Sequence, residues 1–142
     1  MSNQGILPLL VAAIAASVLL PCARAAEVAA LAPAEAAARV AAGKAVLVDV
    51  REAGEWEATG VVASAHLLAL SDLRGPRARW KPFLEANREK ELIFYCRSGG
   101  RSGQAARLLA EEGFRTANAG GLKDWIAGGQ PLRKADEPPK TP

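Results

Sequence analysis

The side chain best suited to chemistry in this sequence is the thiol of Cys96, which begins a short segment rich in glycine, serine and arginine. The segment reads Cys96-Arg97-Ser98-Gly99-Gly100-Arg101-Ser102. An apolar run over 92–95 precedes it, and a helix-favouring run over 104–112 follows it. A thiol at such a strand-to-helix turn faces backbone N–H groups and the positive end of the helix dipole, which both favour the thiolate. The segment therefore predicts an ionised sulfur in a cradle for an anion.

The remaining residues of the segment suit the binding of a small anionic substrate. Backbone N–H groups over 97–101 would form a concave nest around the sulfur, and Gly99 and Gly100 permit the backbone angles that a tight turn needs. The two arginines supply positive charge, and the two serines either donate hydroxyl hydrogen bonds or cap the helix that follows. We predict Cys96 as the catalytic residue. The predicted substrate-binding residues are Arg97, Ser98, Gly99, Gly100, Arg101 and Ser102.

Apolar and helix-favouring runs alternate from residue 27 to about residue 129, which is typical of an α/β domain with a mainly parallel sheet. The expected strands cover 27–31, 45–50, 65–70, 91–95 and 114–118. The expected helices cover 34–42, 52–58, 77–86 and 104–112, with a last helix around Trp125. In such sheets ligands bind at the carboxyl ends of the strands, so three strand ends should share one edge. These are Cys96, the segment 49–51 and the segment 118–120.

Asp49 and Arg51 are predicted to support the site from the end of the second strand. Two interpretations of this pair stay open: a salt bridge that fixes the edge of the site, or a strand-end pair exposed to solvent. His66 is the only histidine of the chain. A Cys–His mechanism needs the two side chains within hydrogen-bond reach, so we favour a strand-end histidine of structural character and leave its role open.

Length and charge narrow the class of protein and its partners. The 142 residues suffice for one domain. A net charge of +3, from 18 Lys and Arg against 15 Asp and Glu, comes without a long basic block, so nucleic acid is not an expected partner. The sequence shows neither a metal-ligand cluster nor a nucleotide-binding loop, so we expect no metal and no cofactor.

The N-terminal segment 1–25 is predicted to be a signal peptide, because an apolar run over 5–20 is followed by Ala23-Arg24-Ala25, which fits a cleavage site. We therefore expect a periplasmic or secreted protein. Two alternatives stay open, namely an uncleaved membrane anchor and lipid attachment at Cys22. A membrane is an expected partner only if the segment is retained. Cleavage would leave Cys96 as the lone cysteine, which excludes an intramolecular disulfide.

The expected domain spans 26–132, and the polar, proline-rich segment 133–142 is expected to be a disordered tail. Several motifs within this domain resemble the single-domain rhodaneses, which are modules of the sulfurtransferase type. The motifs are Leu47-Val48-Asp49-Val50-Arg51-Glu52, Glu55-Trp56, the segment 96–102, Gly120-Gly121-Leu122 with Trp125, and Gly129-Gln130-Pro131-Leu132. The segment 60–69 departs from the family pattern, because Val61, Ala63, Ser64 and Ala69 stand where the family often has His, Pro, Gly and Pro.

The resemblance implies a rhodanese-like fold, with a five-stranded, mainly parallel sheet and helices on both faces. It also implies a sulfurtransferase of the thiosulfate:cyanide type, in which Cys96 carries sulfur as a persulfide. The implied substrates are thiosulfate or a similar anionic donor, and cyanide or a thiol as acceptor. A protein that carries a persulfide is a further candidate partner.

Two other functions stay open on the sequence alone. One is a phosphatase or arsenate reductase, whose cysteine also lies at a helix start. Four residues separate Cys96 from Arg101, and the resulting short cradle favours a sulfur atom over a bulkier oxyanion. The other is a binding module or redox sensor in which Cys96 forms mixed disulfides.

Overall fold

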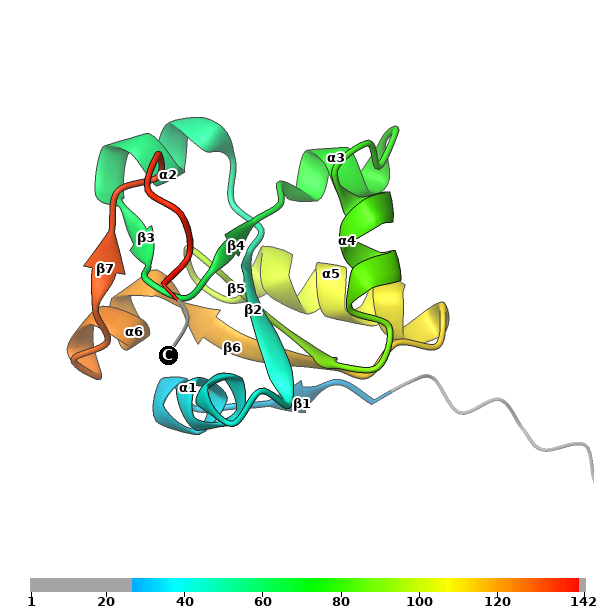
Figure 1. The fold of residues 1–142 in the computed structure, drawn as a ribbon, viewed down its shortest axis with the longest axis horizontal. Coiled ribbons are helices and arrows are strands. Elements are labelled where there is room, and N and C mark those ends of the chain that lie inside the picture. Colours follow the sequence, from blue (N-terminus) through cyan, green and yellow to red (C-terminus); the bar gives the residue numbers. More distant parts are fainter. Residues whose placement is uncertain (1–26, 141–142) are drawn as a thin grey trace, which may run out of the picture.

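The computed structural model describes residues 27–140, so the predicted signal peptide lies outside the described residues. The central sheet has five strands in the order β1-β6-β5-β2-β4, and their arrangement can be followed in Figure 1. All neighbouring strands of this sheet run parallel, as expected. The strands are β1 (Ala29–Ala30), β2 (Ala45–Asp49), β4 (His66–Leu67), β5 (Glu91–Cys96) and β6 (Thr116–Gly121).

Helices cover both faces of the sheet, which confirms the expected α/β architecture (Figure 1). They are α1 (Pro33–Ala41), α2 (Ala53–Thr59), α3 (Leu70–Arg74), α4 (Trp80–Ala86), α5 (Gly100–Glu111) and α6 (Leu122–Ala127). Side chains alternate between the two faces of each strand. On β5, Phe94 packs toward α3, α4 and α5, whereas Tyr95 packs toward α1 and α6. Burial on both faces explains why β2 and β5 are almost wholly apolar.

The third strand is shorter than the expected 65–70, because β4 covers only His66–Leu67. The N–H groups of Leu68 and Leu70 still donate to the carbonyls of Asp49 and Val50, but at Leu70 the chain enters α3, which the sequence did not predict. A helix of five residues is too short to show a clear apolar period.

The expected helix over 77–86 begins only at Trp80. Arg77 has a φ of 57°, which is left-handed and incompatible with a helix start. Pro82 lies in the first turn of α4, where its missing N–H leaves no helical hydrogen bond unmade, so the helix is a single piece.

A second, two-stranded sheet joins β3 (Val61–Val62) to β7 (Leu132–Arg133) in antiparallel pairing. The Arg133 side chain is buried, with Nε donating to the Ala63 carbonyl at 3.1 Å and Nη2 to the Ala65 carbonyl at 2.6 Å. Farther along, the N–H of Lys140 also donates to the Ala63 carbonyl. Residues 133–140 thus differ from the disordered tail that we expected over 133–142, because a buried guanidinium and a backbone hydrogen bond hold them to the domain.

Within residues 27–140, no helix combines the length and the apolar character that crossing a membrane requires.

Candidate active site

Cys96 is the last residue of β5, and α5 begins four residues later, at Gly100. Cys96 is 1% exposed, and its Sγ accepts a hydrogen bond from the Gly99 N–H at 3.0 Å. The Ser102 hydroxyl lies 3.4 Å from the same sulfur. The helix begins at Gly100, four residues earlier than the sequence predicted, so its first turn belongs to the site.

Two opposing effects act on the Cys96 thiol. Burial favours the neutral form, but hydrogen bonds from the Ser102 hydroxyl and from the backbone N–H groups of Ser102, Ser98 and Gly99 favour the thiolate. Their sum lowers the pKa of Cys96 below its ordinary value. A buried sulfur with a lowered pKa is a nucleophile held in place.

The backbone conformation requires a glycine at only one of the two glycine positions in the loop. Gly99 has a φ of 92°, which favours glycine, and this turn aims its N–H at the sulfur. Gly100 has ordinary helical backbone, and a Cβ there would meet nothing within 4 Å, so the expected need for unusual angles at Gly100 is wrong. Neither serine caps α5, because the N-cap is Gly99 without a side-chain hydrogen bond.

A glycine outside the segment is also required. Gly121 lies opposite Cys96 in the β5–β6 register, and a Cβ on it would lie 2.5 Å from the Arg97 carbonyl oxygen. The sequence contained this residue in a motif, but the close approach of the two backbones depends on the sheet pairing.

The two loop arginines differ in their surroundings. Arg97 is exposed, and its side chain makes no hydrogen bond or ion pair with the rest of the described chain. Arg101 is half-buried and donates to both carboxylate oxygens of Glu55 on α2, at 2.6 and 2.7 Å. This ion pair lowers the pKa of Glu55 to about 2 and raises that of Arg101. Sequence reasoning noted Glu55 only as part of a motif and assigned it no role.

The Asp49–Arg51 pair is a buried salt bridge, which excludes the solvent-exposed alternative. Asp49 is 0% and Arg51 2% exposed, and Arg51 Nη2 lies 2.7 Å from the carboxylate. The guanidinium also donates to the Thr59 hydroxyl and to the Gly60 carbonyl. The pair therefore ties the end of β2 to the end of α2, the helix that carries Glu55.

Asn118 is a second residue of the site that received no individual role from the sequence. Its strand end was expected at this edge, and the side chain on β6 does reach the loop. Nδ2 donates to the Gly99 carbonyl at 3.0 Å, and Oδ1 accepts from the Ser102 hydroxyl at 2.8 Å.

His66 is on β4, which β2 separates from β5. Its ring lies 5.3 Å from that of Phe83, and burial, helped by the charges of Arg133 and Lys90, lowers its pKa. The histidine thus packs at the edge of the sheet.

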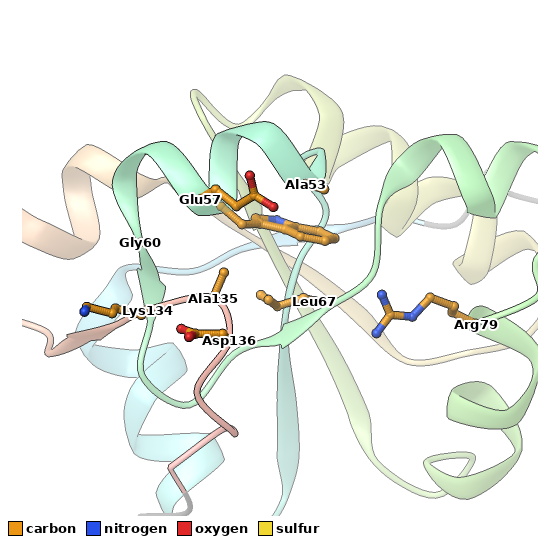
Figure 2. Close-up of a pocket in the computed structure, with 9 residues that line it drawn as sticks. Ala53, Glu57, Gly60, Leu67, Arg79, Lys134, Ala135 and Asp136 are labelled. Atoms are coloured by element: carbon orange, nitrogen blue, oxygen red, sulfur yellow. The ribbon is translucent and has the colours of Figure 1, made fainter.

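A hollow of about 610 Å³ lies beside α2 rather than at the thiol. Figure 2 shows Glu57 on one side of it, Leu67 and Asp136 across from it and Arg79 at one end. No residue of the segment 96–102 lines it. Helix α2 therefore presents Glu55 to the loop and Glu57 to this hollow. Among the described residues, no three His, Cys, Asp or Glu side chains gather as a metal site would require.

The chain is similar to known proteins in both sequence and structure. The model of the Rhodanese-like domain family matches residues 32–128. A thiosulfate:glutathione sulfurtransferase of Saccharomyces cerevisiae is 33% identical over 94 residues, which cover 59% of this chain. The match spans 66% of the yeast protein, just under two thirds of that protein's length. The putative sulfurtransferase YtwF of Bacillus subtilis is 35% identical over 80 residues, covering 56% of this chain and 71% of that protein.

Solved structures show the same fold. A rhodanese with anions from E. coli superposes with a TM-score of 0.51 at 30% identity, over 63% of this chain and 98% of that one. The polysulfide-sulfur transferase of Wolinella succinogenes gives 0.60 at 25% identity, over 80% and 83%. A protein of unknown function from Rhodopseudomonas palustris, described as a possible tyrosine phosphatase, gives 0.63 at 27% identity, over 75% and 85%.

Proposed function

The chain belongs to the rhodanese-like domain family, and from this premise we propose that it transfers sulfane sulfur through a persulfide on Cys96. Its curated relatives named as sulfurtransferases support a reaction with a sulfur donor and a sulfur acceptor. The proposed donor is thiosulfate or a similar small anion. The proposed acceptor is a thiol or cyanide, and a protein that carries a persulfide is a further candidate partner.

The observation that carries this proposal is the hydrogen-bonded, buried Cys96 sulfur. In the first half-reaction its thiolate attacks the outer sulfur of thiosulfate. A new S–S bond forms, the old S–S bond breaks, and the electron pair leaves with sulfite. In the second half-reaction the acceptor attacks the outer sulfur of the persulfide, and the electron pair returns to Sγ as thiolate. Both steps need an anionic sulfur and donors that stabilise it, which the Ser98, Gly99 and Ser102 N–H groups supply.

The two arginines take different roles in this proposal. Arg97 is exposed beside the thiol and would attract the anionic donor from solution. Arg101 already donates to both oxygens of Glu55, so its guanidinium is fixed near the sulfur as a positive charge. The negative charge of a Cys96 thiolate is among the causes that raise the pKa of Arg101, which supports an interaction between this cation and the sulfur.

The same ion pair argues against phosphoryl transfer as the main activity. A phosphoryl group presents three oxygens, and the Arg101 donors that would bind two of them are engaged by Glu55. The R. palustris neighbour nevertheless makes phosphatase activity worth assaying in parallel.

We further propose that segment 1–25 directs export and is removed, so that sulfur transfer takes place in the periplasm or outside the cell. The apolar run and the Ala23-Arg24-Ala25 site support this proposal. Terminal sequencing of protein recovered from the periplasmic fraction tests it. A chain that begins at Ala26 is expected, whereas a chain that retains Met1 in the membrane fraction would support the anchor.

The chemical proposal is tested on the full chain by intact mass measurement after incubation with thiosulfate. We expect a gain of one sulfur atom that cyanide reverses. Cys22→Ser should retain the gain, and Cys96→Ser should lose it, which separates the two cysteines of the chain. Hydrolysis of an aryl phosphate without the sulfur gain would favour the phosphatase. Inactivity in both assays would leave the binding or redox module.

A further inference from the structure

The side-chain amide of Asn118 makes three hydrogen bonds at the base of the loop. Its Oδ1 accepts from the Ser102 hydroxyl at 2.8 Å and from the Gly120 N–H at 3.1 Å, and its Nδ2 donates to the Gly99 carbonyl at 3.0 Å. These partners fix the orientation of the amide. A flipped amide would set its NH₂ against the Gly120 N–H and its oxygen against the Gly99 carbonyl.

Ser102 is fully buried, and its hydroxyl has one proton for two acceptors. Asn118 Oδ1 lies at 2.8 Å and Cys96 Sγ at 3.4 Å, so the two compete for that proton. While Cys96 is a neutral thiol, its S–H can donate to Ser102 Oγ as the hydroxyl donates to Asn118. Once Cys96 is a thiolate, the hydroxyl can turn to the sulfur, and Oδ1 keeps the Gly120 N–H as a partner. Only a hydrogen atom has to move.

We propose that Asn118 is a positioning residue that acts on the Cys96 sulfur through the Ser102 hydroxyl, by competing with the sulfur for the hydroxyl proton. Its role in turnover rests on the proposed sulfur transfer. The inner sulfur is anionic before the donor is attacked, neutral in the persulfide, and anionic again as the acceptor removes the outer sulfur. The Ser102 hydroxyl would donate to Sγ in the two anionic states and to Asn118 in the persulfide.

The charged side chains that already surround the sulfur are left in place by every variant that tests this idea, and only Asn118→Asp adds a further charge. Arg101 on α5 interacts with the sulfur and is held by Glu55 on α2, and Glu52 acts on Arg101 from the start of that helix. Arg97 follows Cys96 directly in the chain. A change at Asn118 leaves these charges in place, so a change in Cys96 ionisation reports on the hydroxyl and on residue 118 itself.

Two substitutions at Asn118 should act in opposite directions. The measurement is the pH dependence of Cys96 alkylation by iodoacetamide, on the full chain carrying Cys22→Ser. Asn118→Asp keeps the oxygen that accepts from Ser102, gives it a negative charge and removes the N–H donor to the Gly99 carbonyl. We expect this change to raise the pKa of Cys96 by about one unit, so that alkylation at a pH below the midpoint of Cys96 ionisation becomes roughly tenfold slower. Asn118→Ala frees the Ser102 hydroxyl for the sulfur, so alkylation should become roughly threefold faster. The Gly103 N–H still donates to the Gly99 carbonyl in both variants, which keeps the loop anchored.

A background variant and a control sharpen the test. The background variant is Ser102→Ala, to which each Asn118 substitution is added. In this background Asn118→Ala should no longer speed alkylation, and the slowing caused by Asn118→Asp should shrink by at least half. Thr116→Val is the matched control. Thr116 is on the same strand and donates from its hydroxyl to the Ala106 carbonyl at 2.9 Å, away from the loop. Thr116→Val should cost stability without moving the alkylation midpoint.

A midpoint that rises in both Asn118 variants would show a merely structural role and overturn the proposal. Equal effects with and without the Ser102 hydroxyl would overturn it too. If Asn118→Asp does not fold, the direction of the Asn118→Ala shift decides alone. Because alkylation needs no sulfur donor, a wild-type chain that never forms a persulfide would refute the proposed function while leaving this assignment standing.

Discussion

Replacing Glu55 by glutamine should destabilise the protein in a way that depends on pH. The pKa of Glu55 is lowered from 4.5 to about 2, chiefly by Arg101. At about 1.4 kcal/mol per pKa unit, this difference corresponds to roughly 3.5 kcal/mol. Both side chains are nearly a third exposed, at 31% and 32%, so solvent screening reduces the expected contribution to about 1–1.5 kcal/mol. Glutamine still offers an oxygen to the Glu52 N–H, so the helix cap is retained.

The sign of the pH dependence follows from the lowered pKa. A carboxylate with a lowered folded-state pKa contributes its full stability above its ordinary value of 4.5. That contribution declines as pH falls below this value and is nearly gone at about 2. Urea unfolding of wild type and Glu55→Gln between about pH 7 and pH 3 measures the difference. It should be constant down to the ordinary pKa and then shrink.

The matched control is Glu57→Gln on the same helix, whose exposed side chain makes no ion pair within residues 27–140 and should change stability by less than about 0.5 kcal/mol. The reasoning is refuted if Glu55→Gln is as stable as wild type at neutral pH, or if its deficit stays the same throughout the acid range.

Three further predictions concern the loop and its supports. Arg97→Ala should lower kcat/KM for thiosulfate by roughly three- to tenfold at low salt and by less at high salt, because an exposed cation acts through long-range attraction. The free energy of unfolding should not change, and equal losses of kcat/KM at both salt concentrations would contradict this prediction. Gly121→Ala should lower the free energy of unfolding by about 2–3 kcal/mol and slow persulfide formation, because its Cβ would lie 2.5 Å from a backbone oxygen. The control Gly100→Ala should be neutral or slightly stabilising, because a Cβ there meets nothing within 4 Å. Asp49→Ala should cost about 3–5 kcal/mol in thermal unfolding because it leaves the Arg51 charge buried and unpaired, and a loss below about 1 kcal/mol would argue against that pairing.

The thiol and its cradle could be predicted from the sequence because they are local. An apolar strand, a turn with Gly99 and a helix are adjacent in the chain, so their order alone places Cys96 at a helix start. The meeting of β2, β5 and β6 at one edge follows from the rule for parallel sheets.

The supporting contacts could not be predicted, because they join residues far apart in the chain. Glu55 is 46 residues from Arg101, and Asn118 is 16 from Ser102. Their pairing depends on where α2 and β6 lie against the loop. The segment 133–140 was misjudged for a related reason, since its composition is typical of disorder but buried Arg133 reaches carbonyls 68 and 70 residues away.

The most direct test of the account is the amount of sulfite released when the full chain meets thiosulfate without any acceptor. Persulfide formation on Cys96 predicts a single burst of about one sulfite per chain. The burst rate should follow the ionisation of Cys96, whose pKa is lowered below its ordinary value. No burst from the wild-type chain, or an equal burst from Cys96→Ser, would contradict the account.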